Sequence, residues 1–424
     1  MRQFAVVLLP MLAFAQEAPL RLDLHAALER ARAWNLAWQT ALTGAALAHE
    51  DTVQAKAALY PTLNYFNQYI YTQGNGTPTG IFVASDGVHV YNSWGDVHED
   101  FSLAKRADYK LALAAEAAAR AKQEIGARGL AATVVQNYYG VVTATRRLSS
   151  ARQSLAEAER FLDITRKQES GGEVAHADAV KAELQVEQRR RELQDAEANR
   201  EKARLGLGVL LFPDIEQAFD LVDDLDDPVP LMPLAEFRAQ ALARSPDVRV
   251  ADAAVAQEKW ALAAARSGYY PTLSVDYFYG IDANQWAAED REGHRLLGSS
   301  GQASLTIPVW NWGATRSRVR QAELRQRQAE LEATVTRRQL TAGINSAWLE
   351  ADTARAQADS LRRSVELSRE SLRLTLLRYQ AGEATALEVV DAQSTLVQAR
   401  NAWDDGLVRY RVALAGVQTM AGTL

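Results

Sequence analysis

The stretch "ALYPTLNYF" at 58–66 returns in closely similar form as "YYPTLSVDYF" at 269–278. The two Tyr-Pro pairs, Tyr60-Pro61 and Tyr270-Pro271, lie 210 positions apart. Proline lacks a backbone donor and pushes the residue before it toward extended geometry, so a helix that arrives at either pair should end there. We therefore interpret both pairs as junctions at which a helix becomes a strand.

The same spacing of 210 recurs along the chain, which indicates an internal duplication. It relates Gly172-Glu173 to Gly382-Glu383, Ala182 to Ala392, Gln188 to Gln398, and Arg190 to Arg400. An acidic, proline-bearing segment, "DLVDDLDDPVPLMP", separates the two halves. We expect a first structural repeat at 16–220, a linker at 221–233 and a second repeat at 234–424.

Composition excludes several classes of protein. The chain has no cysteine, so it can hold neither a disulfide nor a thiolate metal site, and its net charge of −6 argues against a nucleic-acid binder. Arg2, an apolar stretch and a small-residue triplet predict a cleaved signal peptide at 1–15. A buried N-terminal helix or a short anchor is the alternative for this segment.

Most of each repeat has helical periodicity. Seam residues at 130–165 and again at 340–375 alternate steps of four and three, as in a coiled coil, and many of them are alanine. A helix from about Ala104 to Lys167 would be about 95 Å long. Glycine-containing segments at about 168–175 and 379–386 should be the tips of antiparallel helical hairpins, because glycine allows the positive φ that stops a helix. A kinked continuous helix is the alternative.

The residues after each Tyr-Pro pair alternate between apolar and polar. One face carries Leu273, Val275, Tyr277, Tyr279 and Ile281, and a second alternating run carries Leu305, Ile307 and Val309. We expect β-hairpins at about 61–102 and 271–309. Strands with one apolar face and aromatic ends are typical of a transmembrane β-barrel, with the edge of a soluble β-sandwich as the alternative. Four strands are too few to close a barrel, so several chains should share one.

With these features the sequence resembles the outer membrane efflux protein family, the TolC-like channels. The most specific stretches are "RYQAGEATALEVVDAQSTLVQAR" and "IPVWNWGATRSRVRQAE". The resemblance implies a mainly α-helical fold with a small β part. It also implies a homotrimer, in which long antiparallel coiled-coil helices form a periplasmic α-barrel and four strands per chain form a shared twelve-stranded barrel in outer-membrane lipid.

The resemblance further implies a passive channel that contacts a periplasmic adaptor protein and an inner-membrane pump. Its hairpin tips, with Gly171, Gly172, Gly382 and Glu383, would contact the adaptor. Glu388 and Asp391 match an acidic ring at the periplasmic aperture, and Asp178 and Tyr379 match partners of the contacts that close it. Solvated charges near a hairpin tip are the alternative for the two acidic residues.

Some positions depart from the family pattern. Ala384 stands where some relatives carry a basic residue, which weakens the expectation of a salt-bridged lock with Asp178. The counterpart of "IPVWNWG" in the first half is "VHEDFSL", and "WNLAW" replaces "RSPDV", so the first half lacks both prolines.

The sequence contains no catalytic, nucleotide-binding or metal-binding motif that we recognise, so we expect neither an enzyme nor a cofactor. The alternative function is a secreted periplasmic coiled-coil scaffold or adaptor without a pore. Such a protein would keep the helical hairpins, but its β segments need not show alternation that suits lipid.

Overall fold

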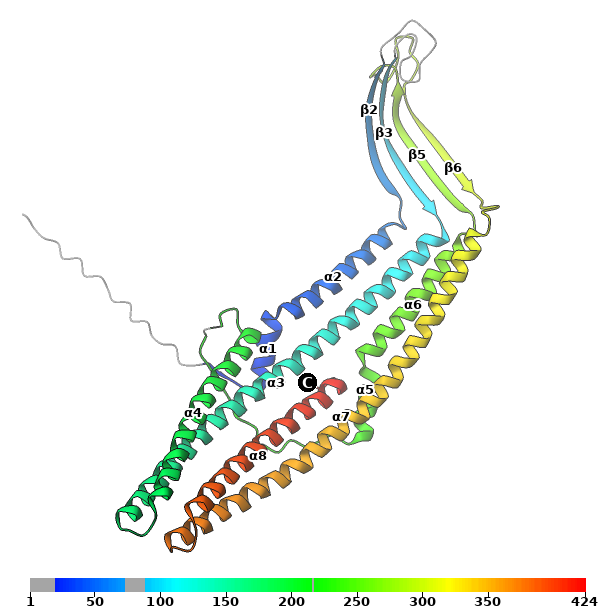
Figure 1. The fold of residues 1–424 in the computed structure, drawn as a ribbon. Coiled ribbons are helices and arrows are strands. Elements are labelled where there is room, and N and C mark those ends of the chain that lie inside the picture. The colour runs from blue at the N-terminus through cyan, green and yellow to red at the C-terminus, as the bar shows by residue number, and fades with distance from the viewer. Residues whose placement is uncertain (1–19, 73–87, 216) are drawn as a thin grey trace, which may run out of the picture. The chain divides into compact units, whose positions relative to one another are not determined.

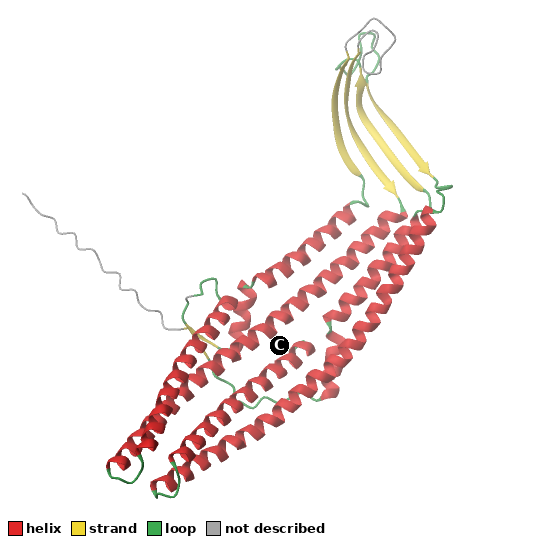
Figure 2. Cartoon of the chain, viewed as in Figure 1, coloured by secondary structure: helices red, strands yellow, loops and turns green. Residues whose placement is uncertain are grey.

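A computed structural model describes residues 20–72, 88–215 and 217–424 (Figures 1 and 2). The predicted signal peptide at 1–15 lies outside these residues. The helices are α1 Leu24–Trp34, α2 Leu36–Ala57, α3 Leu103–Ser170, α4 His176–Leu211, α5 Leu234–Arg244, α6 Pro246–Ser267, α7 Ala314–Gln380 and α8 Ala386–Ala421. The strands are β1 Leu20–Leu22, β2 Thr62–Thr72, β3 Val88–Phe101, β4 Phe219–Leu221, β5 Thr272–Ala283 and β6 Leu297–Thr306. The predicted fold class, mainly helical with a small β part, is confirmed.

The chain forms two compact units. The first contains the described residues up to 38 together with 127–244 and 343–424. The second contains 39–126 and 245–342. No helix in the described ranges has a window of 18 residues apolar enough to cross a membrane.

The second unit contains an antiparallel sheet in the order β2-β3-β5-β6. The two β-hairpins meet because β3 pairs with β5, which places Val97 opposite Tyr277. The expectation that the last strand runs on through Ile307 and Val309 was wrong: β6 begins at Leu297 and ends at Thr306. Pro308 follows directly and has no N–H to donate to a strand ladder.

The sheet has two chemically distinct faces. On one, the large side chains Leu273, Val275 and Tyr277 are all exposed in the single chain. On the other, Nδ1 of His98 lies 2.6 Å from a carboxylate oxygen of Asp276.

Phe278 lies on this second face, where the sequence alternation is interrupted. Its ring packs edge-on against Trp94 at 6.4 Å, and Trp94 lies 4.8 Å from Phe66 on the next strand. The apolar residue at a polar position therefore belongs to a row of aromatic rings across three strands.

Both repeats interrupt their first helix at the same place. Ser245 caps α6 by accepting from the backbone of Val248 at 3.4 Å, with Pro246 as the first helical residue. In the first repeat Asn35 separates α1 from α2, and its side chain accepts from the backbone of Trp38 at 3.1 Å. An asparagine cap therefore preserves the break without the proline.

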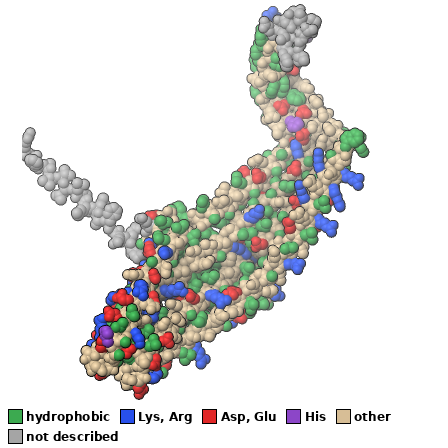
Figure 3. Space-filling model, viewed as in Figure 1, with side chains coloured by type: hydrophobic (Ala, Val, Ile, Leu, Met, Phe, Trp, Pro, Cys, Tyr) green, Lys and Arg blue, Asp and Glu red, His purple; other side chains and the backbone are tan. Residues whose placement is uncertain are grey.

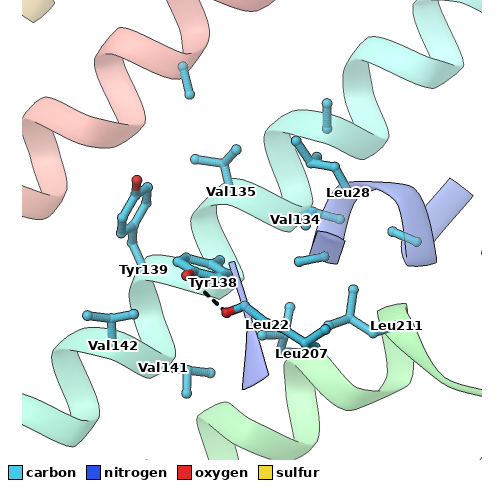
Figure 4. Packing of buried hydrophobic residues seen from close by; sticks show 14 of the residues in the cluster. Leu22, Leu28, Val134, Val135, Tyr138, Tyr139, Val141, Val142, Leu207 and Leu211 are labelled. Carbon is cyan, nitrogen blue, oxygen red and sulfur yellow. Dashed lines mark hydrogen bonds between the residues drawn. The ribbon is translucent and has the colours of Figure 1, made fainter. Parts of the chain in front are cut away.

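The largest hydrophobic cluster lies in the first unit and is drawn from α1, α3, α4 and their flanking strands (Figure 4). Tyr138 on α3 is 1% exposed, and its hydroxyl donates to the backbone of Val222 at 2.6 Å and of Leu22 at 3.4 Å. Leu22 belongs to β1, which pairs in parallel with β4. This short pairing has no pattern that sequence analysis could detect.

The linker, which belongs to the first unit, is bound to α7 and α8 through its backbone carbonyls. The hydroxyl of Tyr410 donates to Val229 at 2.5 Å, and the indole of Trp348 donates to Met232 at 2.9 Å. Arg411 donates to the carbonyl of Asp227 at 3.0 Å. Side chains of α7 and α8 therefore satisfy polar groups that an irregular segment would otherwise leave unpaired.

Arg146 on α3 joins the linker to α8. Its guanidinium is 2.5 Å from Asp223, 2.8 Å from Asp226 and 3.4 Å from Asp404. The Asp404 side chain is only 10% exposed, and this burial raises the pKa of its carboxyl although Arg146 acts in the opposite direction.

Candidate functional site

The two helical hairpin tips have the same backbone construction. At the first tip the N–H of Gly172 donates to Glu169 and that of Glu173 donates to Gln168, both at 2.9 Å. At the second tip Gly382 donates to Tyr379 at 3.0 Å, and Glu383 donates to Arg378 at 2.8 Å. These are Schellman motifs, in which the glycine adopts positive φ: 77° at Gly172 and 76° at Gly382. Gly171 precedes the first of these glycines and does not have positive φ.

Tyr379 is buried between helices rather than displayed at the tip. Only 3% of its surface is exposed, and its ring lies 5.1 Å from that of Phe161 on α3. Its hydroxyl lies 3.2 Å from the hydroxyl of Thr165, also on α3. Both partners lie in the α3 seam region, but the sequence periodicity did not show that they meet Tyr379.

Glu388 begins α8 in a capping box with Thr385. Its carboxylate accepts from the backbone N–H of Thr385 at 3.1 Å, while the Thr385 hydroxyl accepts from the backbone N–H of Glu388 at 3.3 Å. The Thr385 hydroxyl also donates to this carboxylate at 3.2 Å, and the backbone hydrogen bond first, then this one, lower the pKa of Glu388. Arg378 lies 3.6 Å from the same carboxylate. Sequence analysis did not identify this capping role, although the Thr-x-x-Glu spacing is its signature.

Asp391 follows Glu388 by almost one helical turn and has a different environment. Its side chain is exposed and makes no ion pair or hydrogen bond within the described residues. Asp178, in the first turn of α4, lies 3.5 Å from Lys181. Ala384 packs against the buried cluster around Tyr379. The four aperture candidates therefore differ: Asp391 is unpaired, Glu388 and Asp178 face cations, and Tyr379 is internal.

A groove of about 590 Å³ lies between α3, α7 and α8 near the tips. Its lining combines apolar side chains with more basic than acidic ones: Phe161, Leu372, Leu396, Arg160, Arg369, Arg400 and Glu157 are among them. One terminal nitrogen of Arg400 is buried without a hydrogen-bond partner. The groove could therefore accept a segment with both apolar and acidic side chains.

The Tyr-Pro pairs lie between the last helical residue and the first strand residue of each repeat. Pro61 directly precedes β2 and Pro271 directly precedes β5. Tyr60 is 59% exposed and Tyr270 is 55% exposed. Each tyrosine N–H donates three residues back, to Ala57 and to Ser267, which closes the last turn of the helix.

In the described ranges one group of side chains has its potential ligand atoms within 4.8 Å of one another, namely Asp290, Glu292 and His294 between β5 and β6. Asp290 already accepts from the backbone of Glu292 and of His294 at 2.8 Å, so its carboxylate organises the turn.

Comparisons with known proteins agree with the fold. Residues 238–423 match the family model described as outer membrane efflux protein. The chain is 28% identical over 279 residues to the cobalt-zinc-cadmium resistance protein CzcC of Cupriavidus metallidurans, covering 65% of this chain and 63% of that one. It is 27% identical over 308 residues to the outer membrane protein OprJ of Pseudomonas aeruginosa, covering 71% and 62%.

Among solved structures, the Campylobacter jejuni CmeC outer membrane channel superposes with a TM-score of 0.82 at 16% identity, covering 94% of this chain and 85% of that one. At this identity the superposition shows the fold alone. The matched region spans about three fifths of the length of the first curated relatives.

Proposed function

We propose that the chain, whose residues 238–423 match the outer membrane efflux protein family, is the outer-membrane channel of a tripartite efflux or secretion system. In this proposal it is a passive homotrimeric conduit across the periplasm and the outer membrane, with no catalytic step of its own. A periplasmic adaptor protein and an inner-membrane pump are its proposed partners.

The observation that supports this proposal best is the sheet with two open edges. In the described chain β2 pairs only with β3, and β6 pairs only with β5. Unpaired backbone groups in hydrocarbon each cost several kcal/mol, so the strand edges must find partners in other copies if the sheet lies in lipid. A scaffold without a pore would have no need for a sheet with one lipid-compatible face and one hydrogen-bonded polar face.

The test is to extract the membrane fraction in detergent, determine the oligomer mass, and reconstitute the same species into a planar bilayer. We expect a trimer that conducts in discrete steps. A monomer without conductance would overturn the channel and favour the scaffold.

We place the cation-selective part of the aperture chiefly at Asp391. Its carboxylate is unpaired in the chain, whereas the charge of Glu388 is partly offset by Arg378 and by the capping hydrogen bonds. Copies of Asp391 around a narrow opening would favour cations and repel one another.

Asp391→Asn should therefore reduce cation selectivity in single-channel recordings more than Glu388→Gln does. Glu388→Gln also serves as the matched control, because glutamine can keep the capping hydrogen bonds. Equal selectivity in wild type and Asp391→Asn would remove the filter role from this residue.

For the adaptor we propose contacts at the tips and in the neighbouring groove. The tips present Gly171, Gly172, Gly382 and Glu383 at the ends of the helical hairpins. The apolar and basic side chains that line the groove would suit a helical segment that carries apolar and acidic side chains.

A further inference from the structure

The segment between β6 and α7 differs from its counterpart in the first repeat. After Phe101, β3 reaches α3 through Ser102 alone, whereas seven residues, 307–313, separate β6 from α7. This longer connection contains "IPVWNWG". The long connection is therefore a feature of the second repeat alone.

The connection displays its large apolar side chains. Trp312 is 90% exposed, Val309 87% and Trp310 75%. The two indole rings pack edge to face with their centroids 5.9 Å apart. Neither indole N–H has a hydrogen-bond partner among the described residues. Exposed amphipathic rings of this kind are suited to the headgroup region of a bilayer.

The backbone holds these rings in place by a disfavoured conformation. Trp312 has a φ of 55°, and it is the one non-glycine residue with positive φ in the described chain. Gly313 follows with a φ of 81°, and Asn311 hydrogen-bonds to the buried Thr315 of α7. A bulky residue at positive φ is rare and clusters at functional positions.

The first turns of α7 carry unpaired positive charge beside this loop. Arg316 and Arg318 are exposed and make no ion pair or hydrogen bond within the described residues. Arg320 lies 3.5 Å from Glu323. The first turn of α7 contains arginine and no acidic residue. The positive end of the helix dipole lies there and disfavours arginine. The helix itself therefore gives no reason for these charges.

Figure 3 shows hydrophobic side chains clustered beside the base of the sheet, with Lys and Arg side chains along the adjoining helices.

Given a rise of about 1.5 Å per residue, Arg316 and Arg318 lie within about 6 Å of the start of α7. Arg325 and Arg327 lie about 17 to 20 Å from it. At physiological salt the screening length is about 8 Å, so only the first pair is close enough to interact strongly with headgroup charges at the level of the loop.

We propose that Trp310, Trp312, Arg316 and Arg318 form a binding surface for anionic phospholipid headgroups in the periplasm-facing leaflet. The inference rests on the proposed function, because it requires the sheet to lie in the outer membrane. The indoles insert at the headgroup level, and the guanidinium groups pair with the phosphates of lipids that carry net negative charge.

The experiment measures lipid retention on the detergent-purified full chain by native mass spectrometry, with phosphatidylglycerol and phosphatidylethanolamine compared at equal concentration. The wild-type protein should retain more phosphatidylglycerol than phosphatidylethanolamine. Each basic residue near an anionic surface strengthens binding by about fivefold, so Arg316→Gln with Arg318→Gln should lower this preference by about 25-fold.

Arg325→Gln with Arg327→Gln is the matched control, since these residues lie on the same helix, are exposed and are also unpaired. The control variant should keep the preference of wild type. Equal retention of the two lipids by wild type, or an equal loss in both double variants, would overturn the proposal.

Three further measurements make the result specific. Trp310→Ala with Trp312→Ala should weaken retention of both lipids, and unchanged retention would show that the indoles are not part of the lipid-binding surface.

Raising salt from 50 to 500 mM should reduce the preference of wild type for phosphatidylglycerol, and this measurement does not depend on any variant folding. Inorganic phosphate should not stabilise the protein as phosphatidylglycerol does, and equal stabilisation would identify a free-phosphate site instead.

Conductance of the same preparations separates the two proposals. Wild type and Arg316→Gln with Arg318→Gln should conduct alike if the lipid surface lies outside the channel. A conducting wild type without lipid preference overturns this inference alone, whereas a wild type that does not conduct contradicts the proposed function.

Discussion

Tyr379 was predicted to be a partner of the inter-helix contacts that close the aperture, and within one chain it makes a contact between helices. Its ring packs on Phe161 and its hydroxyl lies beside that of Thr165 on α3. The contact therefore joins α3 to α7 within one chain.

Substitutions at Tyr379 should separate packing from hydrogen bonding. Tyr379→Phe should destabilise the tip by only about 1 kcal/mol, because Thr165 still donates to the carbonyl of Phe161 at 3.0 Å. Tyr379→Ala should cost about 3 to 5 kcal/mol, since it leaves a cavity against Phe161. Hydrogen exchange of peptides from the two tips measures both effects, and similar exchange in the two variants would contradict the packing role.

Asp404 allows a prediction about pH. Its pKa is raised in the folded chain, mainly by burial, so the folded chain holds the proton more tightly than the unfolded chain does. The stabilisation from this proton is lost as the pH rises from the ordinary value of about 3.9 through the raised pKa. The thermal midpoint of wild type relative to Asp404→Asn should therefore increase on acidification from pH 7, and a constant difference would contradict the assignment.

Arg146 is the matched test of the same network. Arg146→Met leaves the buried Asp404 without its cation and should destabilise by about 3 kcal/mol at pH 7. Asp404→Asn should lower the free energy of unfolding much less, because Arg146 still forms ion pairs with Asp223 and Asp226. Denaturant unfolding at pH 7 compares the two variants, and equal losses would show that Asp404 does not depend on this arginine.

At the scale of the elements, patterns with a local physical cause were predictable and pairings between distant segments were not. Proline at 61 and 271 and glycine at 172 and 382 act on their own backbone, so the helix ends could be located from sequence. The parallel pairing of β1 with β4 joins three-residue strands that have no periodicity. The Thr165–Tyr379 contact depends on how α3 and α7 pack, which helical periodicity does not specify.

Replacing either of the two positive-φ glycines at the tips, Gly172 or Gly382, should destabilise the local structure. Gly172→Ala and Gly382→Ala place a side chain at positive φ and should each destabilise their tip by about 1 to 2 kcal/mol. Gly171→Ala is the control, because this residue does not have positive φ and its added methyl would meet nothing closer than 3.5 Å. Local hydrogen exchange should rank the three variants accordingly, and an equal effect at Gly171 would argue against the Schellman geometry.

Gly280 should be the most sensitive glycine in the sheet. A Cβ there would lie 2.2 Å from the carbonyl oxygen of Ser93 and 2.4 Å from Cα of Trp94, so β5 would have to move away from β3. Gly298, its partner on β6, has open space around it and provides the control. Gly280→Ala should lower the temperature at which the detergent-solubilised oligomer dissociates, whereas Gly298→Ala should leave it nearly unchanged.

At the scale of the whole molecule, the two repeats share their architecture but not their hydrophobic core. The largest cluster takes its buried residues from positions 22–225 together with Ala415. The second repeat contributes smaller buried clusters, such as Val365 with Leu372 and Leu396. Within the first unit the linker contacts Tyr410 and Trp348, which belong to the second repeat.

The pairing of β1 with β4 has a consequence for the order of folding during synthesis. Because β1 pairs with β4, the strand at Leu20–Leu22 can form its ladder as soon as residue 221 is available, before the second repeat has been made. The first half then already possesses nearly all of the largest core, and domains made early tend to fold first. The second half would fold later and pack against the already folded first half.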